Sequence, residues 1–173
     1  IEVEDDVTAY LEYENGATGV FVTTTADCPG DNRFEVMCER GKLVCEDGKL
    51  TVCKLNQSER EYCFNATEGF RPLEHTDYQP ETDGKNDQHN GVLRAFAAHI
   101  LHGDPLVADG SEGIFGLTLC NAMYLSSWLD ETVSLPLDED LFLEELNKRR
   151  ATSRRKDHVT ETVADLAGTY GAH

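Results

Sequence analysis

The sequence has no long apolar run and few basic residues. No apolar stretch approaches the ~20 residues that a membrane-spanning helix needs, and no basic, apolar and small-residue leader is recognisable. We therefore expect a soluble, cytoplasmic protein. The 15 basic residues stand against 33 acidic residues, which gives a formal charge of -18. Because an acidic surface repels phosphate groups, nucleic acid and anionic membranes are not expected as partners.

The six cysteines are spread along the chain without a C-x-x-C pair, so their spacing is not that of a zinc site. Cys38, Cys45, Cys53 and Cys63 fall in or beside expected strands, and Cys120 falls in an apolar helix. Without secretory features we expect reduced and mostly buried thiols. The even count leaves one alternative, a disulfide-stabilised extracellular carbohydrate binder, which predicts few free thiols.

The usual catalytic motifs are also missing. There is no G-x-S-x-G elbow, no P-loop and no H-E-x-x-H. The spacing Gly110-x-x-Gly113-x-x-Gly116 differs from the dinucleotide motif G-x-G-x-x-G, and no βαβ unit precedes it. We therefore expect this chain alone to contain no catalytic residue, to hold no metal and to bind no nicotinamide cofactor.

The first third of the chain alternates polar and apolar residues, as an antiparallel sheet with one open face does. Asn15–Gly16 separates two expected strands, and turns at Arg40–Gly41 and Asp47–Gly48 separate three more. Another strand is expected over residues 59–65, and a weaker one over 73–79. The pattern predicts six or seven strands in a meander.

Helical patterns follow the strands. Apolar residues recur at three- and four-residue spacing over 92–101, which predicts a first helix. A second, apolar helix is expected to end with Trp128, and a third is expected over residues 138–150. Between the last two, residues 133–137 (VSLPL) are expected to form a short edge strand.

Strands first and helices later is the order of an α+β fold. We expect an open, largely antiparallel β-sheet with helices packed on one face. One domain is predicted over residues 1–150, followed by a polar tail over 151–173.

A polar cluster marks the start of the first long helix. It consists of Asn86, Gln88, His89 and Asn90, with Asp87 among them. Backbone N–H groups at a helix start, together with an imidazole, can meet an anionic or hydroxylated ligand. The spacing alone leaves an ordinary N-terminal cap as the alternative.

The motifs from residue 89 to residue 140 follow a distinctive order: F-x-x-x-I-x-x-G-x-P, G-x-x-G, N-A-x-Y-L-S-S-W and V-x-L-P. They are carried by Phe96, Ile100, Gly103, Pro105, Gly110, Gly113, Asn121, Ala122, Tyr124, Leu125, Ser126, Ser127, Trp128, Val133, Leu135 and Pro136. This order resembles the C-terminal domain of the Gfo/Idh/MocA (glucose-fructose oxidoreductase/inositol dehydrogenase/rhizopine catabolism) family. The upstream strands are similar as well, so the resemblance covers residues 4–142.

The resemblance implies a C-terminal domain of an NAD(P)-dependent oxidoreductase that acts on a sugar, cyclitol or related hydroxyl substrate. In that family the nucleotide fingerprint and the E-K-P lysine lie in an N-terminal Rossmann domain, which is absent from this sequence, so the isolated chain is expected to be inactive. The alternative is a stand-alone ligand-binding or assembly module without redox activity.

The resemblance also assigns roles to particular residues. It implies that His89 contacts the sugar or polyol substrate. It implies the same role, less directly, for Asn86, Gln88 and Asn90. It further implies a homo-oligomer formed through the open sheet face, whose exposed residues include Thr23, Thr25, Glu35 and Met37.

Overall fold

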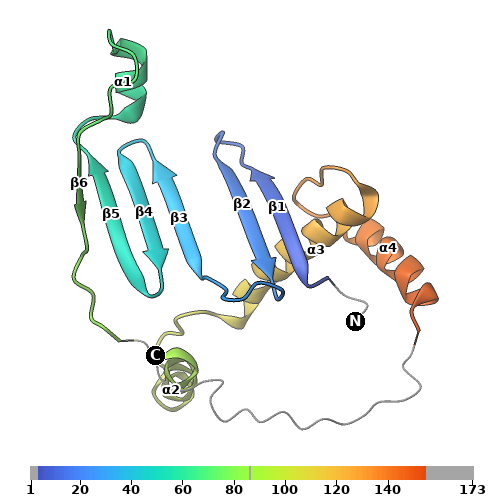
Figure 1. The fold of residues 1–173 in the computed structure, drawn as a ribbon. Helices are drawn as coiled ribbons and strands as arrows, with labels where there is room; N and C mark the ends of the chain where they lie inside the picture. Colours follow the sequence, from blue (N-terminus) through green and yellow to red (C-terminus); the bar gives the residue numbers. More distant parts are fainter. Residues whose placement is uncertain (1–3, 86, 155–173) are drawn as a thin grey trace. The chain divides into compact units, whose positions relative to one another are not determined.

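The computed structural model describes residues 4–85 and 87–154 (Figure 1). The strands in these ranges are β1 Asp6–Glu12, β2 Thr18–Thr24, β3 Arg33–Cys38, β4 Gly41–Glu46, β5 Lys49–Leu55 and β6 His75–Tyr78. The α-helices are α1 Glu59–Asn65, α2 Gln88–His102, α3 Gly113–Leu129 and α4 Glu139–Thr152, and a short 3-10 turn, η1 Gly110–Glu112, precedes α3. The predicted α+β class with open antiparallel sheets is confirmed.

The chain divides into two compact units. Of the described residues, the first unit contains 9–18 together with α3 and α4. The second contains 5–8 and 19–107, and thus β3 to β6, α1 and α2. The packing of helices on one sheet face and the single domain over residues 1–150 stay predictions.

β1 and β2 form a two-stranded sheet. The connection lies at the predicted Asn15–Gly16 turn, where Gly16 has a φ of +83° and the Asn15 side chain accepts a hydrogen bond of 3.0 Å from the Ala17 N–H. Glycine adopts this left-handed conformation without steric cost. The hairpin predicted from the sequence is confirmed.

β3, β4, β5 and β6 form a four-stranded sheet in that order, and each neighbouring pair is antiparallel. The first two connections lie at the predicted turns, with φ values of +136° at Gly41 and +74° at Gly48. Because residues paired across antiparallel strands share a face, the register divides the sheet into two faces.

We name these two faces by their side chains. The polar face consists of Arg33, Glu35, Met37, Lys42, Val44, Glu46, Lys49, Thr51, Cys53, Leu55, His75 and Asp77. The apolar face includes Phe34, Val36, Leu43, Cys45, Leu50, Val52 and Tyr78. The two-sided sheet predicted from sequence alternation is therefore present.

One predicted strand is a helix instead. Residues 59–65 form α1, whose N-cap Ser58 accepts a hydrogen bond of 3.1 Å from the Glu61 N–H and donates one to the Glu39 carboxylate. Ser58 and Glu61 have the S-x-x-E spacing of a capping box, which favours a helix start over the β preference of the aromatic residues in the segment. β6, by contrast, lies within the weak strand predicted over 73–79.

Residues 133–137 do not form the predicted edge strand. A strand requires a neighbour for its N–H and C=O groups, and no strand among the described residues pairs with this segment. Pro136 has no N–H to contribute in any case. The segment is instead an irregular connection with a bend at Leu135 and Pro136. It leads to Asp138, whose side chain caps α4 by accepting a 2.9 Å hydrogen bond from the Leu141 N–H.

The helical unit, which consists of α3 and α4, packs around Trp128. Its ring lies 5.5 Å from the Phe142 ring in a stacked arrangement, and the Arg149 guanidinium lies 4.1 Å from the Trp128 centroid. Leu125, one helical turn before Trp128, is 1% exposed. α4 begins with acidic and ends with basic residues, as predicted from the macrodipole preference.

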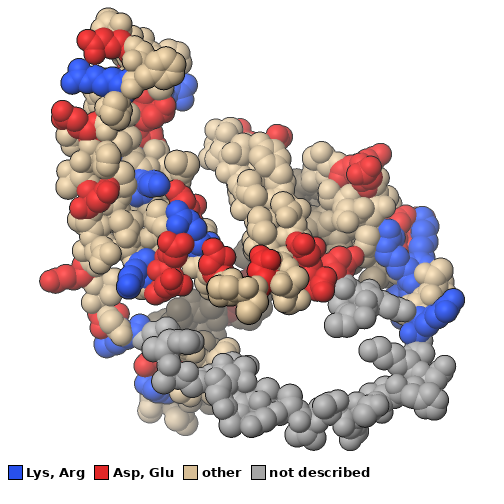
Figure 2. Space-filling view, in the orientation of Figure 1, with Lys and Arg blue, Asp and Glu red and all other residues tan. Residues whose placement is uncertain are grey.

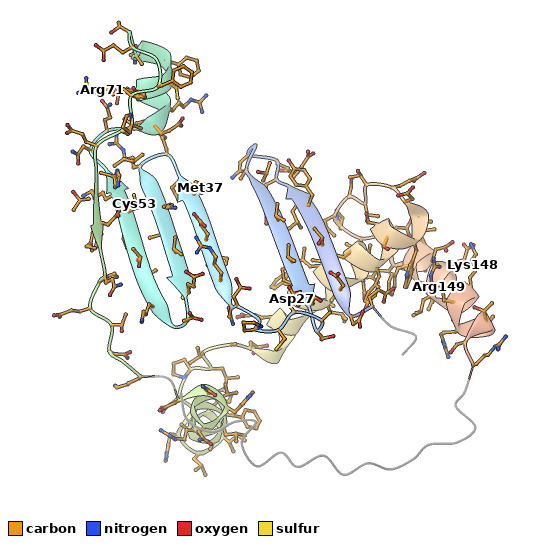
Figure 3. All side chains as sticks on the ribbon, in the orientation of Figure 1. Asp27, Met37, Cys53, Arg71, Lys148 and Arg149 are labelled. Atoms are coloured by element: carbon orange, nitrogen blue, oxygen red, sulfur yellow. The ribbon has the colours of Figure 1, made fainter. Side chains whose placement is uncertain are left out.

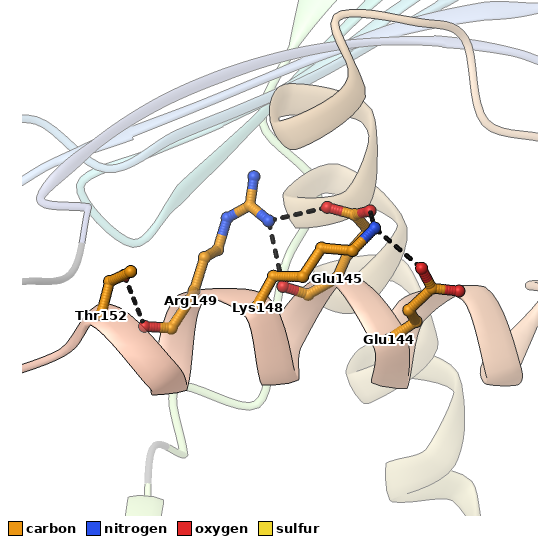
Figure 4. Close-up of polar contacts among 5 residues, drawn as sticks. All are labelled: Glu144, Glu145, Lys148, Arg149 and Thr152. Carbon is orange, nitrogen blue, oxygen red and sulfur yellow. Dashed lines mark hydrogen bonds and ion pairs between the residues drawn. The ribbon is translucent and has the colours of Figure 1, made fainter.

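The basic residues of α4 are engaged within the helix. Figure 2 shows Lys and Arg side chains gathered over α4. In the close-up of Figure 4, Glu145 accepts hydrogen bonds from Lys148 at 2.6 Å and from Arg149 at 2.9 Å. Lys148 also pairs with Glu144 at 2.8 Å. These ion pairs stabilise α4 and orient Arg149 for its contact with Trp128.

The cysteines differ from the prediction in one respect. All six are free, but five are exposed and Cys53 is half-buried, so the expectation of mostly buried thiols is wrong. Of the strand cysteines, Cys38 and Cys45 are exposed and Cys53 is half-buried. In the part of the chain that the structure describes, no helix is both long and apolar enough to cross a membrane.

Candidate functional site

The predicted ligand cluster lies at the start of α2. Gln88, His89 and Asn90 are the first three residues of the helix, and all three are exposed; Asn86 lies outside the described residues. Gln88 has a φ of +43°, which is unusual for a residue with a side chain. Successive helical side chains point about 100° apart, so these three do not converge on one ligand through the helix geometry alone.

Asp87 holds this helix start in place without capping it. Its side chain makes no capping hydrogen bond; instead, its Oδ2 accepts one of 2.9 Å from the Arg94 guanidinium, two turns into the helix. The Asp87 carbonyl accepts a backbone hydrogen bond of 3.0 Å from Gly91. The first turn of α2 therefore presents amide and imidazole groups to solvent on a fixed backbone.

Sequence reasoning missed a hollow of about 420 Å³ beside α1. Its lining includes Gln57, Glu61, Asn65 and Arg71, and the Tyr62 hydroxyl donates a 2.8 Å hydrogen bond to the Arg71 carbonyl at its edge. Small-molecule sites are lined mainly by apolar side chains, whereas this hollow is mostly polar and open. The S-x-x-E capping signal at Ser58 could have located the helix but not the hollow.

The β3–β4 half of the polar face carries a network of ion pairs. Arg33 contacts Glu35 at 2.7 Å and Glu46 at 3.0 Å, and Lys42 contacts Glu35 at 3.2 Å. Hydrogen bonds from Arg33, and then from Lys42, hold the pKa of the Glu35 carboxyl below its ordinary value. Figure 2 shows acidic and basic side chains interspersed over these strands.

Met37 stands out on this charged half of the sheet. It is 78% exposed and pairs across the sheet with Lys42 (Figure 3). Met is among the residues that are enriched in protein–protein interfaces. Thr23 and Thr25, also predicted for this face, lie on and just after β2, outside the four-stranded sheet.

The β5–β6 half of the polar face brings together a cysteine, a histidine and a carboxylate. Cys53 and Asp77 are paired directly across the two strands, and His75 lies two residues before Asp77 on the same face. One donor atom from each of the three lies within 4.8 Å of the others. His75 and Asp77 lie 22 and 24 positions after Cys53 in the sequence, so sequence spacing could not predict the cluster.

Hydrogen bonds set the chemical state of this cluster. The Cys53 thiol donates to the Asp77 carboxylate, and this bond, followed by partial burial, raises the pKa of the thiol. The His75 Nδ1 lies 3.1 Å from the Leu73 carbonyl oxygen, and the His75 Nε2 lies 4.0 Å from an Asp77 carboxylate oxygen. The three groups are thus held close together and open to solvent on one side.

Comparison with known proteins bears on the first quarter of the chain. Residues 1–44 match the family model of the GFO/IDH/MocA C-terminal domain. In the described residues this segment contains β1, β2, β3 and most of β4. The resemblance inferred from the sequence is therefore confirmed for this segment. No curated protein matches the chain.

Proposed function

We propose that the chain is the C-terminal, substrate-side domain of an NAD(P)-dependent oxidoreductase acting on a sugar, cyclitol or related hydroxyl. The observation that supports this most directly is the match of residues 1–44 to the GFO/IDH/MocA C-terminal domain, a family of oxidoreductases. The α+β order and the open sheet agree with it. We place NAD or NADP, which accepts or supplies the hydride, in a separate nucleotide-binding domain, since this sequence has no dinucleotide motif.

The start of α2 is the part of this chain that we assign to the substrate. An imidazole and carboxamides can both donate and accept hydrogen bonds, which suits a polyhydroxylated ligand whose hydroxyls do the same. His89, Gln88 and Asn90 offer these groups on the first helical turn. We assign them to binding and orientation of the substrate, together with Asn86, and assign no proton transfer to them.

The polar face is the surface that we assign to a second copy of the chain. The network of Arg33, Glu35, Lys42 and Glu46 already satisfies its own charges, so pairing this face leaves no lone ion buried. Met37, near the end of the edge strand β3, adds an exposed apolar side chain. These two features together favour a symmetric contact over an open, solvated face.

Light scattering tests the assembly with a Met37→Glu variant. We expect the wild-type chain to have the mass of a dimer or tetramer, and the variant to fall to monomer because an added carboxylate would be buried in the contact, on the same face as Glu35. Met37→Leu is the matched control and should keep the wild-type mass, since it keeps the apolar contact. Equal masses for wild type and Met37→Glu would contradict the assembly role.

The rival function, a stand-alone binding or assembly module, draws support from the short extent of the family match, which ends at residue 44. The coding sequence upstream of Ile1 separates the two functions. A G-x-G-x-x-G motif and an E-K-P motif in the same reading frame support the oxidoreductase. A start codon close before Ile1 supports the module.

A further inference from the structure

The cluster of Cys53, His75 and Asp77 offers one sulfur, one nitrogen and one oxygen donor on a single face of the sheet. The pairing of β5 with β6 fixes this arrangement, because Cys53 and Asp77 are directly opposite and His75 follows the same alternation. Figure 3 labels Cys53 on β5, where its neighbour β6 completes the sheet. The backbone therefore positions all three side chains before any ligand arrives.

The hydrogen bond of His75 Nδ1 leaves Nε2, the ring nitrogen on the side of Asp77, available to a metal ion. A carbonyl oxygen only accepts, so the Nδ1 that lies 3.1 Å from the Leu73 oxygen carries the proton. In the neutral ring, Nε2 then holds the free lone pair, and it lies 4.0 Å from Asp77 Oδ2. Metal-binding histidines almost always donate their second ring N–H to a carbonyl or carboxylate in this way.

The distances fit a small tetrahedral cation. Zinc binds cysteine sulfur at about 2.3 Å, histidine nitrogen at about 2.0–2.1 Å and carboxylate oxygen at about 2.0–2.2 Å, which places neighbouring donors roughly 3.3–3.6 Å apart. The three donor atoms already lie within 4.8 Å of one another. His75 and Asp77 are exposed, so small side-chain rotations can close the remaining gap.

The charges also suit a divalent cation. A Cys53 thiolate and the Asp77 carboxylate together balance a charge of +2, while the chain as a whole has a formal charge of -18. Lys42, which faces Cys53 from β4, opposes a cation, but its ammonium is held by Glu35 at 3.2 Å. The mixed sulfur, nitrogen and oxygen donors favour zinc over magnesium or calcium, which prefer oxygen alone.

We propose that Cys53, His75 and Asp77 bind one zinc ion, with water as the fourth ligand, and that the ion fastens the short edge strand β6 to β5. Binding forms the zinc–sulfur bond and releases the thiol proton of Cys53 to solvent, so charge and atoms balance without any redox step. The hydrogen bond between thiol and carboxylate holds the site together when no ion is bound.

Cobalt and zinc titrations of the full chain test this site. Cobalt(II) is expected to give an intense thiolate-to-cobalt absorption band at one equivalent, and zinc is expected to abolish that band by displacement. Cys53→Ser should lose the band, and His75→Gln and Asp77→Asn should weaken zinc binding by more than about 100-fold, because even indirect ligand partners contribute 10- to 100-fold. Zinc should also raise the unfolding temperature of the wild type but not of Cys53→Ser.

Two matched variants control for the remaining thiols. Cys45→Ser removes a strand cysteine from the opposite, apolar face, and Cys63→Ser removes one from α1. Both are expected to keep the band and the zinc-induced rise in unfolding temperature. The proposal is overturned if the wild type shows no thiolate band, if the band persists in Cys53→Ser, or if Cys45→Ser abolishes it. The test does not involve nicotinamide or a polyol, so it stands apart from the proposed function.

Discussion

At the scale of single residues, Glu145 organises the helical unit. It is 9% exposed and accepts hydrogen bonds from both Lys148 and Arg149. Arg149 in turn lies over the Trp128 ring. An acidic residue on α4 thereby fixes the guanidinium that covers the aromatic contact between α3 and α4.

The stability of this unit should depend on acid pH through Glu145. Hydrogen bonds from Lys148, and then from Arg149, lower the pKa of Glu145 below its ordinary value of 4.5. The folded state therefore binds this proton less readily than the unfolded state, and Glu145 stabilises the fold above about pH 4.5. That stabilisation is lost as pH falls through the lower, folded-state pKa.

Urea unfolding followed by the fluorescence of Trp128, the single tryptophan, measures this effect. We expect Glu145→Gln to be less stable than wild type at neutral pH, with the difference shrinking towards zero in acid. Glu144→Gln is the control, because Glu144 is 64% exposed and should show a much smaller difference. A wild-type to Glu145→Gln difference that stays constant with pH would contradict this role.

At the scale of elements, turn chemistry explains why much of the sheet could be predicted. Asn15–Gly16, Arg40–Gly41 and Asp47–Gly48 each mark a connection that the structure contains. The strand predicted over 59–65 is wrong because the Ser58 side chain caps a helix start there. The 133–137 segment was mistaken for a strand because its sequence suits an edge, but pairing depends on a partner that the sequence does not reveal.

The two sheet glycines should differ in their tolerance of a side chain. At Gly41, with a φ of +136°, an added Cβ would overlap the Cys53 carbonyl oxygen on β5. At Gly48, with a φ of +74°, an added Cβ would meet open space. Gly48→Ala is therefore expected to cost about 1–2 kcal/mol of left-handed strain, and Gly41→Ala clearly more, because the β4–β5 pairing must also shift.

Urea unfolding monitored by far-UV circular dichroism compares the two glycine variants. The free energy of unfolding is expected to be highest for the wild type, lower for Gly48→Ala and lowest for Gly41→Ala. Equal losses for the two variants would show that the close approach of β4 to Cys53 has no energetic consequence.

At the scale of the whole molecule, the candidate sites of the described residues lie on exposed surfaces. Large apolar side chains are exposed on several elements, among them Phe34 at 67%, Met37 at 78% and Phe115 at 69%. The described residues bury one hydrophobic side chain fully, Leu125. Such exposure agrees with a domain that works together with other polypeptide surfaces.

The candidate sites show the limit of sequence reasoning at this scale. The cluster at the start of α2 is contiguous in sequence, so its position on one helical turn could be foreseen, while its ligand could not. The Cys53, His75 and Asp77 cluster depends on the register of β5 against β6, which no spacing rule contains. Contiguous groups can be found from sequence, whereas groups joined by strand pairing require the fold.

The central claim, that the chain is the substrate-side domain of an oxidoreductase, is tested most directly by nicotinamide reduction. The assay compares the complete gene product with the 173-residue chain on a panel of sugars and cyclitols, using NAD and NADP. The account predicts that a longer gene product with a dinucleotide motif reduces NAD or NADP with a sugar or cyclitol, and that the chain alone does not. Reduction by the chain alone, or a gene product without that motif and without activity on any hydroxyl substrate, would contradict it.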